Sequence, residues 1–277
     1  MDDKELEYIL GTGIEELERL AIQHRLWASA TSAAWDRAGI GLGHSVLDFG
    51  CGPGNVSFDL AQLVGREGKV YGIDQSRRFV NYVNQQAKNN HIPQIEARLG
   101  SAEEVAAIFP EKNNFDFVYA RWLLCWLPNP ERAIEQVFQL LKPGGKFIIH
   151  DYFNWGTMAM APRSAAFEKA VRACVETFDE AGGDIEIAAR LPKILKEQGF
   201  SISHKQVHQK IAWGGTYGSD VWWMITFFRN FVPRLKEMGK LSGEEAEEVF
   251  GLMKELESND EVFCTCPPLF EFIATKS

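Results

Sequence analysis

The segment Asp48-Phe49-Gly50-Cys51-Gly52-Pro53-Gly54-Asn55 combines a carboxylate with three closely spaced glycines, a combination suited to holding a ligand. It follows the apolar run 45–49, which predicts a strand, and precedes residues 56–64, whose pattern predicts a helix. At a turn from strand to helix the backbone comes closest to a ligand above the carboxyl edge of a parallel sheet. Glycine permits that approach because it has no side chain to intervene. We therefore expect a ligand at this turn.

The spacing of the glycines narrows the class of ligand. A dinucleotide-binding G-x-G-x-x-G pattern that begins at Gly50 requires its third glycine at position 55, where the chain has Asn55. No Gly-Lys-Ser/Thr sequence follows the turn, which excludes a P-loop. Asp48, at the end of the strand, would lie near a cationic ammonium group rather than a pyrophosphate. An NAD(P)-dependent oxidoreductase is therefore the less favoured alternative.

The pattern Asp48-x-Gly50-x-Gly52-x-Gly54 resembles the first motif of class I S-adenosylmethionine-dependent methyltransferases. Four further segments resemble motifs of this family and follow in the same order. They are Asp74 at the end of the second predicted strand, Gly100-Ser101-Ala102-Glu103, Phe115-Asp116-Phe117-Val118, and Leu140-Leu141-Lys142-Pro143-Gly144-Gly145. The resemblance covers about residues 44–152 and implies a methyltransferase of the small-molecule type that uses S-adenosylmethionine.

The resemblance assigns residues to the cofactor. Asp48 and the glycine turn would hold its amino-acid portion, Asp74 its ribose, and Ser101, where the family usually has Asp, its adenine. Tyr8 and Gln23 belong to an N-terminal segment similar to that of bacterial small-molecule methyltransferases, which implies a place near the methionine end. The expected cofactor contacts are Tyr8, Gln23, Asp48, Gly50, Cys51, Gly52, Gly54, Asp74, Gln75, Ser101, Ala102, Glu103, Arg121 and Trp122.

The residues after the fourth and fifth predicted strands are the candidates for catalysis. Arg121 and Trp122 follow the fourth strand and should lie beside the transferred methyl group. Arg121 stands where metal-dependent catechol-type enzymes of this family have a carboxylate, so we expect no divalent metal. His150 and Asp151 end the fifth strand as candidate general bases, and we favour Asp151, since strand alternation turns only one of them into the site.

Aromatic side chains make up 12% of the sequence and gather in the segments that follow strands and in the region before the last strand. Such rings favour an apolar or aromatic acceptor, or a cationic amine held over ring faces. They do not choose among oxygen, nitrogen and carbon as the methylated atom. The expected acceptor pocket comprises Trp126, Tyr152, Trp155, Trp222, Trp223 and Phe227.

Alternating strand and helix patterns between residues 45 and 151 predict βαβ units and a parallel sheet. The resemblance adds a sixth strand at 200–213 and an antiparallel seventh at 269–275. The expected fold is an α/β, Rossmann-like, seven-stranded, mostly parallel sheet with an antiparallel last strand and a helical cap. We assign residues 1–44 to an N-terminal cap, 45–213 and 259–277 to the core, and 214–258 to a cap insert.

Composition excludes several classes of partner. The 38 acidic against 29 basic residues give a net charge of −9, which would repel nucleic acid. No apolar stretch reaches the roughly 20 residues of a membrane span, and the acidic start is unlike a signal peptide, so we expect a cytoplasmic protein. An exposed apolar insert allows a homodimer. The five cysteines are too sparse for a disulfide framework.

Two alternatives stay open at this point. Cys264 and Cys266 could meet His204 and His208 as zinc ligands if their strands were neighbours, although ordinary strand residues are the favoured interpretation. The chain could also be a non-catalytic cofactor-binding module whose cap packs on a partner chain, because the first motif shows only competence to bind.

Overall fold

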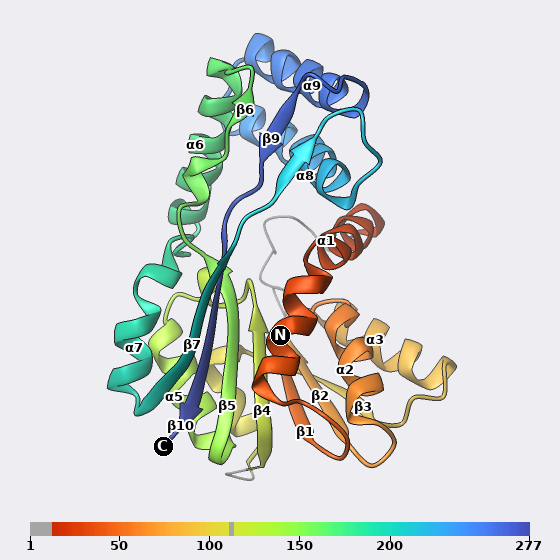
Figure 1. The fold of residues 1–277 in the computed structure, drawn as a ribbon, viewed down its shortest axis with the longest axis vertical. Helices are drawn as coiled ribbons and strands as arrows, with labels where there is room; N and C mark the ends of the chain where they lie inside the picture. Colours follow the sequence, from red (N-terminus) through yellow and green to blue (C-terminus); the bar gives the residue numbers. More distant parts are fainter. Residues whose placement is uncertain (1–12, 111–113) are drawn as a thin grey trace, which may run out of the picture.

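A seven-stranded sheet forms the centre of the computed structural model, which describes residues 13–110 and 114–277 (Figure 1). The strand order is β3-β2-β1-β4-β5-β10-β7, and β10 runs antiparallel to both of its neighbours. The expected Rossmann-like sheet with an antiparallel last strand is thus confirmed. The strands are β1 (Ser45–Phe49), β2 (Lys69–Asp74), β3 (Ile95–Leu99), β4 (Phe115–Arg121), β5 (Leu141–Tyr152), β7 (Phe200–His208) and β10 (Leu269–Lys276).

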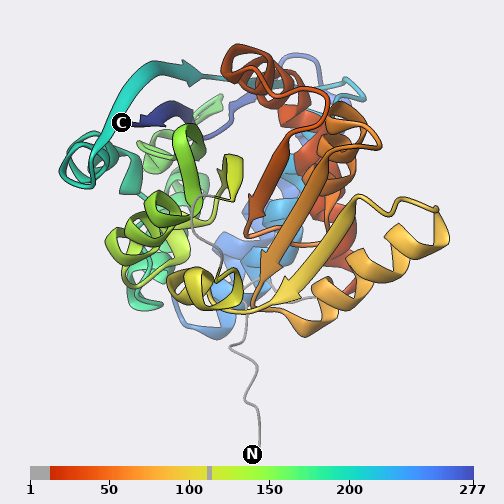
Figure 2. The same ribbon diagram turned by 90° about the horizontal axis from the view of Figure 1, so that it is seen from below.

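Helices cover both faces of this sheet (Figure 2). Side chains alternate along each strand, so neighbours such as Val46 and Leu47 enter two separate apolar cores. One face carries α1 (Ile14–Ala38), α2 (Asn55–Val64) and α3 (Arg77–Asn89), and the other carries α4 (Val105–Ile108), α5 (Pro130–Leu140) and α7 (Leu191–Glu197). Ser76 caps α3 by accepting a hydrogen bond from the Phe79 amide at 3.3 Å.

A second layer stands above the carboxyl ends of the parallel strands (Figure 1). It consists of α6 (Ala165–Glu180), α8 (Ser219–Glu237), α9 (Gly243–Ser258) and a small sheet of β6 (Met160–Ala161), β9 (Phe263–Thr265) and β8 (Ile211–Trp213). The first part of α1 packs against α8. The division of the chain into a core and a two-part cap stays a prediction.

The sixth strand is shorter than the sequence indicated. Instead of running to Trp213, it ends at His208, and residues 211–213 form β8 in the small sheet. The cause lies on the partner strand, where Pro267 and Pro268 have no amide hydrogen and separate β9 from β10. Pairing with β10 therefore stops at Leu269 opposite His208 and resumes in another sheet.

The described residues contain no helix of sufficient length and apolar character to cross a membrane.

Candidate functional site

A cavity of about 650 Å³ lies between the carboxyl ends of the strands and the second layer. Its wall comes from the turn after β1, the ends of β2, β4 and β5, the first part of α1, and α8. These are the places where a parallel α/β sheet binds ligands, because several strand ends and helix starts converge there. One cavity thus joins the glycine turn to the aromatic segments.

The glycine turn forms one end of the cavity. Gly50 and Gly54 have φ of +79° and +84°. A Cβ at position 50 would lie 2.8 Å from Leu123, and a Cβ at position 54 would lie 2.7 Å from Val83. Gly52 has no atom within 4 Å of the place where its Cβ would be, and it lines the cavity. The turn is therefore tightly packed at Gly50 and Gly54 and open to a ligand at Gly52.

Asp74 fixes the glycine turn against the end of β2. Its carboxylate accepts hydrogen bonds from the amides of Gly52 and Ser76, each at 2.8 Å, and burial raises the pKa of this carboxyl. Asp74 also lines the cavity, together with Gln75. A carboxylate at this place can accept hydrogen bonds from neighbouring hydroxyl groups of a ligand.

Asp48 supplies a buried acid to the same end of the cavity. Its carboxylate accepts a hydrogen bond from Ser57 Oγ at 2.5 Å. Burial raises its pKa to about 7, although the Ser57 hydrogen bond and the Arg121 charge oppose this shift. A cationic ligand group would stabilise the ionised form, since an opposite charge in a desolvated site favours it.

Arg121 ties the end of β4 to α1. One guanidinium nitrogen donates to Thr31 Oγ1 at 3.1 Å, and the other lies 3.1 Å from His24 Nδ1. Because arginine only donates, His24 accepts through Nδ1, and its Nε2 is free to donate to Asp59, 3.0 Å away. The guanidinium also lies 4.8 Å from the centre of the Trp122 ring, so several elements fix its position on the cavity wall.

Trp122 has a strained backbone at the centre of the site. Its φ is +51°, a value that bulky residues rarely adopt. The indole stacks on Tyr152, with ring centres 5.8 Å apart, and meets Trp27 edge to face. Strain of this kind is commonly stored at functional sites, where packing compensates for it.

The structure places neither candidate base on the cavity wall. Asp151 is fully buried and accepts hydrogen bonds from the amides of Leu124, Cys125 and Tyr152, while burial raises its pKa to about 7. His150 is also fully buried, on the side of the sheet that α1 covers. The strand continues for one more residue, and it is Tyr152 that reaches the wall. A catalytic role for Asp151 or His150 stays a prediction.

Rings form the opposite end of the cavity, as the aromatic content of the sequence indicated. Of the six expected pocket residues, Trp222 alone is not on the wall, because adjacent residues of α8 point about 100° apart and Trp223 faces the cavity. Five are on the wall, namely Trp126, Tyr152, Trp155, Trp223 and Phe227. Phe178 and Leu127 also line it and were not expected.

The remaining expected cofactor residues have mixed outcomes. Tyr8 lies outside the described residues. Ser101 lines the cavity, but its hydroxyl accepts a hydrogen bond from the Glu103 amide at 3.2 Å. The expected contacts that line the cavity are Gln23, Asp48, Gly50, Cys51, Gly52, Asp74, Gln75, Ser101, Ala102, Glu103, Arg121 and Trp122, whereas Gly54 packs below it.

A buried polar triad on α1 is a feature that the sequence reasoning missed. Arg19 pairs with Glu16 at 2.6 Å and donates to Gln23 Oε1 at 2.5 Å, and both Arg19 and Gln23 line the cavity. The spacing of three and four residues places all three side chains on one helix face. That spacing is visible in the sequence and could have identified the triad.

Comparison with known proteins identifies the family. A family model described as "Methyltransferase domain" matches residues 41–214, and the chain therefore belongs to this family of methyltransferase domains. The demethylmenaquinone methyltransferase of Lactococcus lactis is 35% identical over 126 residues, which are 46% of this chain and 48% of that protein. The corresponding protein of Oceanobacillus iheyensis is 31% identical over 126 residues, 46% of this chain and 50% of that protein. The match thus spans about half the length of these relatives.

Solved structures share the fold over most of the chain. A candidate methyltransferase from Bacillus halodurans superposes with a TM-score of 0.60 and 19% identity, covering 90% of this chain and 99% of that one. The [4+2]-cyclase SpnF gives 0.56 and 18%, covering 90% and 80%. Phosphoethanolamine N-methyltransferase 2 of Haemonchus contortus, solved with S-adenosylhomocysteine, gives 0.54 and 18%, covering 90% and 52%. At these identities the likeness establishes the fold alone.

Proposed function

We propose that the chain is an S-adenosylmethionine-dependent methyltransferase that acts on a small, apolar or aromatic organic acceptor. The observation that carries this proposal is the continuous cavity, with the buried carboxylate of Asp48 and the partly buried carboxylate of Asp74 at one end and stacked rings at the other. The family supports a methyl-transfer reaction, and the names of the relatives, demethylmenaquinone methyltransferases, support an acceptor with an aromatic ring system.

The residues present suit the proposed cofactor. Asp48 would bind its ammonium group, the open face at Gly52 would accommodate its amino-acid portion, and Asp74 would accept hydrogen bonds from its ribose hydroxyls. Phe79 and Ala102 also line the cavity, and their side chains could offer an apolar surface to a flat base. The cofactor supplies an activated methyl group, so the protein needs to position the two reactants and exclude water.

The described part of the cavity wall offers few side chains that could accept a proton from the acceptor. Its described acidic side chains, Asp48, Asp74 and Glu103, belong to the motifs assigned to the cofactor. Among the described lining residues, Tyr152 carries a phenol, which lies at the aromatic end. We therefore infer an acceptor whose nucleophile loses its proton readily, such as an acidic hydroxyl or an activated ring carbon, or one that carries a free lone pair.

Calorimetry on the purified chain tests the first part of the proposal. S-adenosylmethionine and S-adenosylhomocysteine should each bind at one site, and NAD should not bind. Asp48→Asn should weaken the binding of S-adenosylmethionine, whereas the control Asp36→Asn, at an exposed position on α1, should leave it unchanged. Binding of NAD without binding of S-adenosylmethionine would overturn the proposal in favour of an oxidoreductase.

A labelled methyl donor tests the second part. Incubation with panels of quinols, phenols and apolar amines should transfer label to one chemical class. Tight cofactor binding with no transfer to any class, or to cell extracts, would instead support a non-catalytic binding module. The homodimer and the cytoplasmic location expected from the sequence stay predictions.

A further inference from the structure

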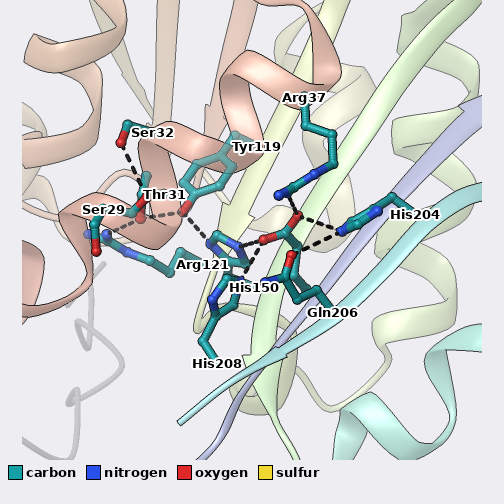
Figure 3. A network of polar contacts seen from close by, with 11 residues as sticks. Ser29, Thr31, Ser32, Arg37, Tyr119, Arg121, His150, His204, Gln206 and His208 are labelled. Atoms are coloured by element: carbon teal, nitrogen blue, oxygen red, sulfur yellow. Dashed lines mark hydrogen bonds and ion pairs between the residues drawn. The ribbon is translucent and has the colours of Figure 1, made fainter. Parts of the chain in front are cut away.

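Three imidazole side chains converge on one buried carboxylate, away from the cavity (Figure 3). His208 Nε2 and His150 Nε2 lie 2.8 and 3.2 Å from Glu271 Oε2. His204 Nε2 lies 3.5 Å from the other carboxylate oxygen, Oε1. His150 and Glu271 are fully buried, whereas His208 and His204 are 16% and 29% exposed. The group is therefore built into the sheet but can be reached from its edge.

The register of the sheet positions these four side chains. His150 on β5 is directly opposite Glu271 on β10, and Glu271 is opposite Gln206 on β7. His204 and His208 lie two residues to either side of Gln206, so the period of two places them on the same face of the sheet as Glu271. Three paired strands, rather than loops, thus hold the group in place.

The separations suit a metal ion. Within the described part of the chain, His150, His208 and Glu271 are the three side chains whose ligand atoms all lie within 4.8 Å of one another, and Cys264 and Cys266 are not among them. Zinc bonds of about 2.0–2.1 Å imply ligand atoms about 3.3 Å apart in a tetrahedral site. The two separations between histidine nitrogen and Glu271 Oε2, 2.8 and 3.2 Å, are close to that value, and the ligand atoms of the two histidines lie within 4.8 Å of each other.

We propose that His150, His208 and Glu271 bind one divalent transition metal ion of the zinc type, with a water molecule as the fourth ligand. Two imidazoles and a carboxylate form a known zinc ligand set that leaves a fourth position open. The ion would connect β5, β10 and β7, and it would enter past His208.

Neighbouring groups provide the outer contacts that such a site requires. His150 Nδ1 lies 3.0 Å from the Tyr119 hydroxyl, which lies 3.4 Å from Thr31 Oγ1. Metal-binding histidines usually use their second nitrogen in this way, which fixes the ring and its tautomer. Arg37 donates to Glu271 Oε1 at 2.5 Å and thereby leaves Oε2 to the ion.

Metal titration of the untagged, metal-stripped chain tests the proposal, because a polyhistidine tag would itself bind the ions. Cobalt(II) is the spectroscopic probe. One equivalent should produce the visible absorption of a tetrahedral site, and zinc should displace it. Zinc should also raise the melting temperature, since a ligand of the native state stabilises it. Because these measurements use the unmodified chain, their outcome does not depend on whether a variant folds.

Two variants locate the site. His208→Ala removes a partly exposed ligand and should weaken zinc binding at least tenfold, and Glu271→Gln should weaken it as well. His91→Asn, at an exposed position with φ of +54° that asparagine tolerates, should leave binding unchanged. Absence of stoichiometric cobalt or zinc binding, or unchanged binding in a folded His208→Ala chain, would overturn the proposal. The group would then be a polar network in which Glu271 interacts with Arg37 and the three histidines without a metal ion.

Discussion

The two ends of the cavity are built in different ways. The end assigned to the cofactor uses backbone groups and short acids from the segments 48–54 and 74–76, which lie side by side where the paired strands β1 and β2 end. The aromatic end brings together Trp126, Trp155 and Phe227 from three separate parts of the chain. Local turn geometry therefore specifies the first end, whereas tertiary packing specifies the second.

This difference implies that the two ends of the cavity respond differently to substitution. A turn with fixed backbone angles tolerates few substitutions, because it contacts the ligand through backbone atoms whose positions depend on those angles. A wall of rings from distant helices can be altered one side chain at a time without disturbing the turn. The predictions below test this contrast, beginning with the largest expected effect.

Gly54→Ala should have the largest effect. The new Cβ would lie 2.7 Å from Val83 Cγ2, at a φ of +84°. The unfavourable backbone angle and the overpacking together should lower the free energy of unfolding by about 2–4 kcal/mol and abolish tight cofactor binding. Urea denaturation and calorimetry measure the two effects.

The matched control for that substitution is Gly251→Ala. Gly251 lies inside α9, where a Cβ would meet no atom within 4 Å. Alanine should stabilise that helix by about 0.5–1 kcal/mol and leave the cavity unchanged. Equal effects at positions 54 and 251 would contradict the claim that the turn is uniquely constrained.

Asp48→Asn should weaken cofactor binding by about 10- to 150-fold, since a hydrogen bond to a charged group contributes about 1.5–3 kcal/mol. Binding of a cationic group requires the ionised form of Asp48, whose pKa of about 7 is raised by burial. The affinity of the unmodified chain should therefore rise with pH up to about 7 and then level off.

The same raised pKa affects stability in the opposite direction. The contribution of Asp48 to the stability of the cofactor-free chain is present below its unfolded pKa of 3.8 and is lost as the pH rises toward about 7. Asp48→Asn should consequently be more stable than the unmodified chain above pH 7, and this advantage should disappear near pH 4. An advantage that does not change with pH would argue against a raised pKa.

Asp151→Asn distinguishes a positioning residue from a general base. Asp151 holds the segment after β4 through the amides of Leu124 and Cys125. Asparagine has one oxygen where Asp151 accepts through both carboxylate oxygens, so its amide nitrogen would face a backbone N–H donor. The substitution should therefore lower the free energy of unfolding by about 1–3 kcal/mol and raise the KM of the acceptor, with cofactor affinity unchanged. Asp179→Asn, exposed on α6, is the control. A large loss of kcat at unchanged stability and KM would instead identify Asp151 as the base.

Trp223→Phe should have the smallest effect and should act on the aromatic end alone. Its ring stacks on Phe227, with centres 5.4 Å apart. Loss of part of this contact should raise the KM of the acceptor about 2- to 12-fold, which corresponds to about 0.5–1.5 kcal/mol, without changing cofactor affinity. Trp222→Phe, one residue away and off the wall, should change neither. Equal effects of the two substitutions would contradict the assignment of the wall.

The sequence allowed the sheet, the glycine turn and the carboxylates Asp48 and Asp74 to be predicted, because local pattern and spacing determine them. Other features depend on packing that no local pattern encodes. Which of Trp222 and Trp223 faces the cavity follows from how α8 lies on the second layer. The positive φ of Trp122 likewise follows from its packing between Tyr152 and Trp27.

The length of β5 also could not be derived from its residue pattern. The fifth strand extends to Tyr152, so the residues that were expected at the site, His150 and Asp151, lie one step too deep in the sheet. The break between β7 and β8 depends in turn on two prolines in a partner segment about 60 residues further along the chain.

Helix α1 belongs to both the sheet and the cavity, which makes its docking and ligand binding thermodynamically linked. Its second half covers the central sheet through Ala34 and Trp35, while Arg19 and Gln23 in its first half line the cavity. A ligand that contacts the docked helix and not the undocked one stabilises docking, by about 2.7 kcal/mol at a concentration 100 times its Kd. Amide exchange in the first half of α1 should accordingly slow when the cavity fills, while exchange in β1 stays unchanged.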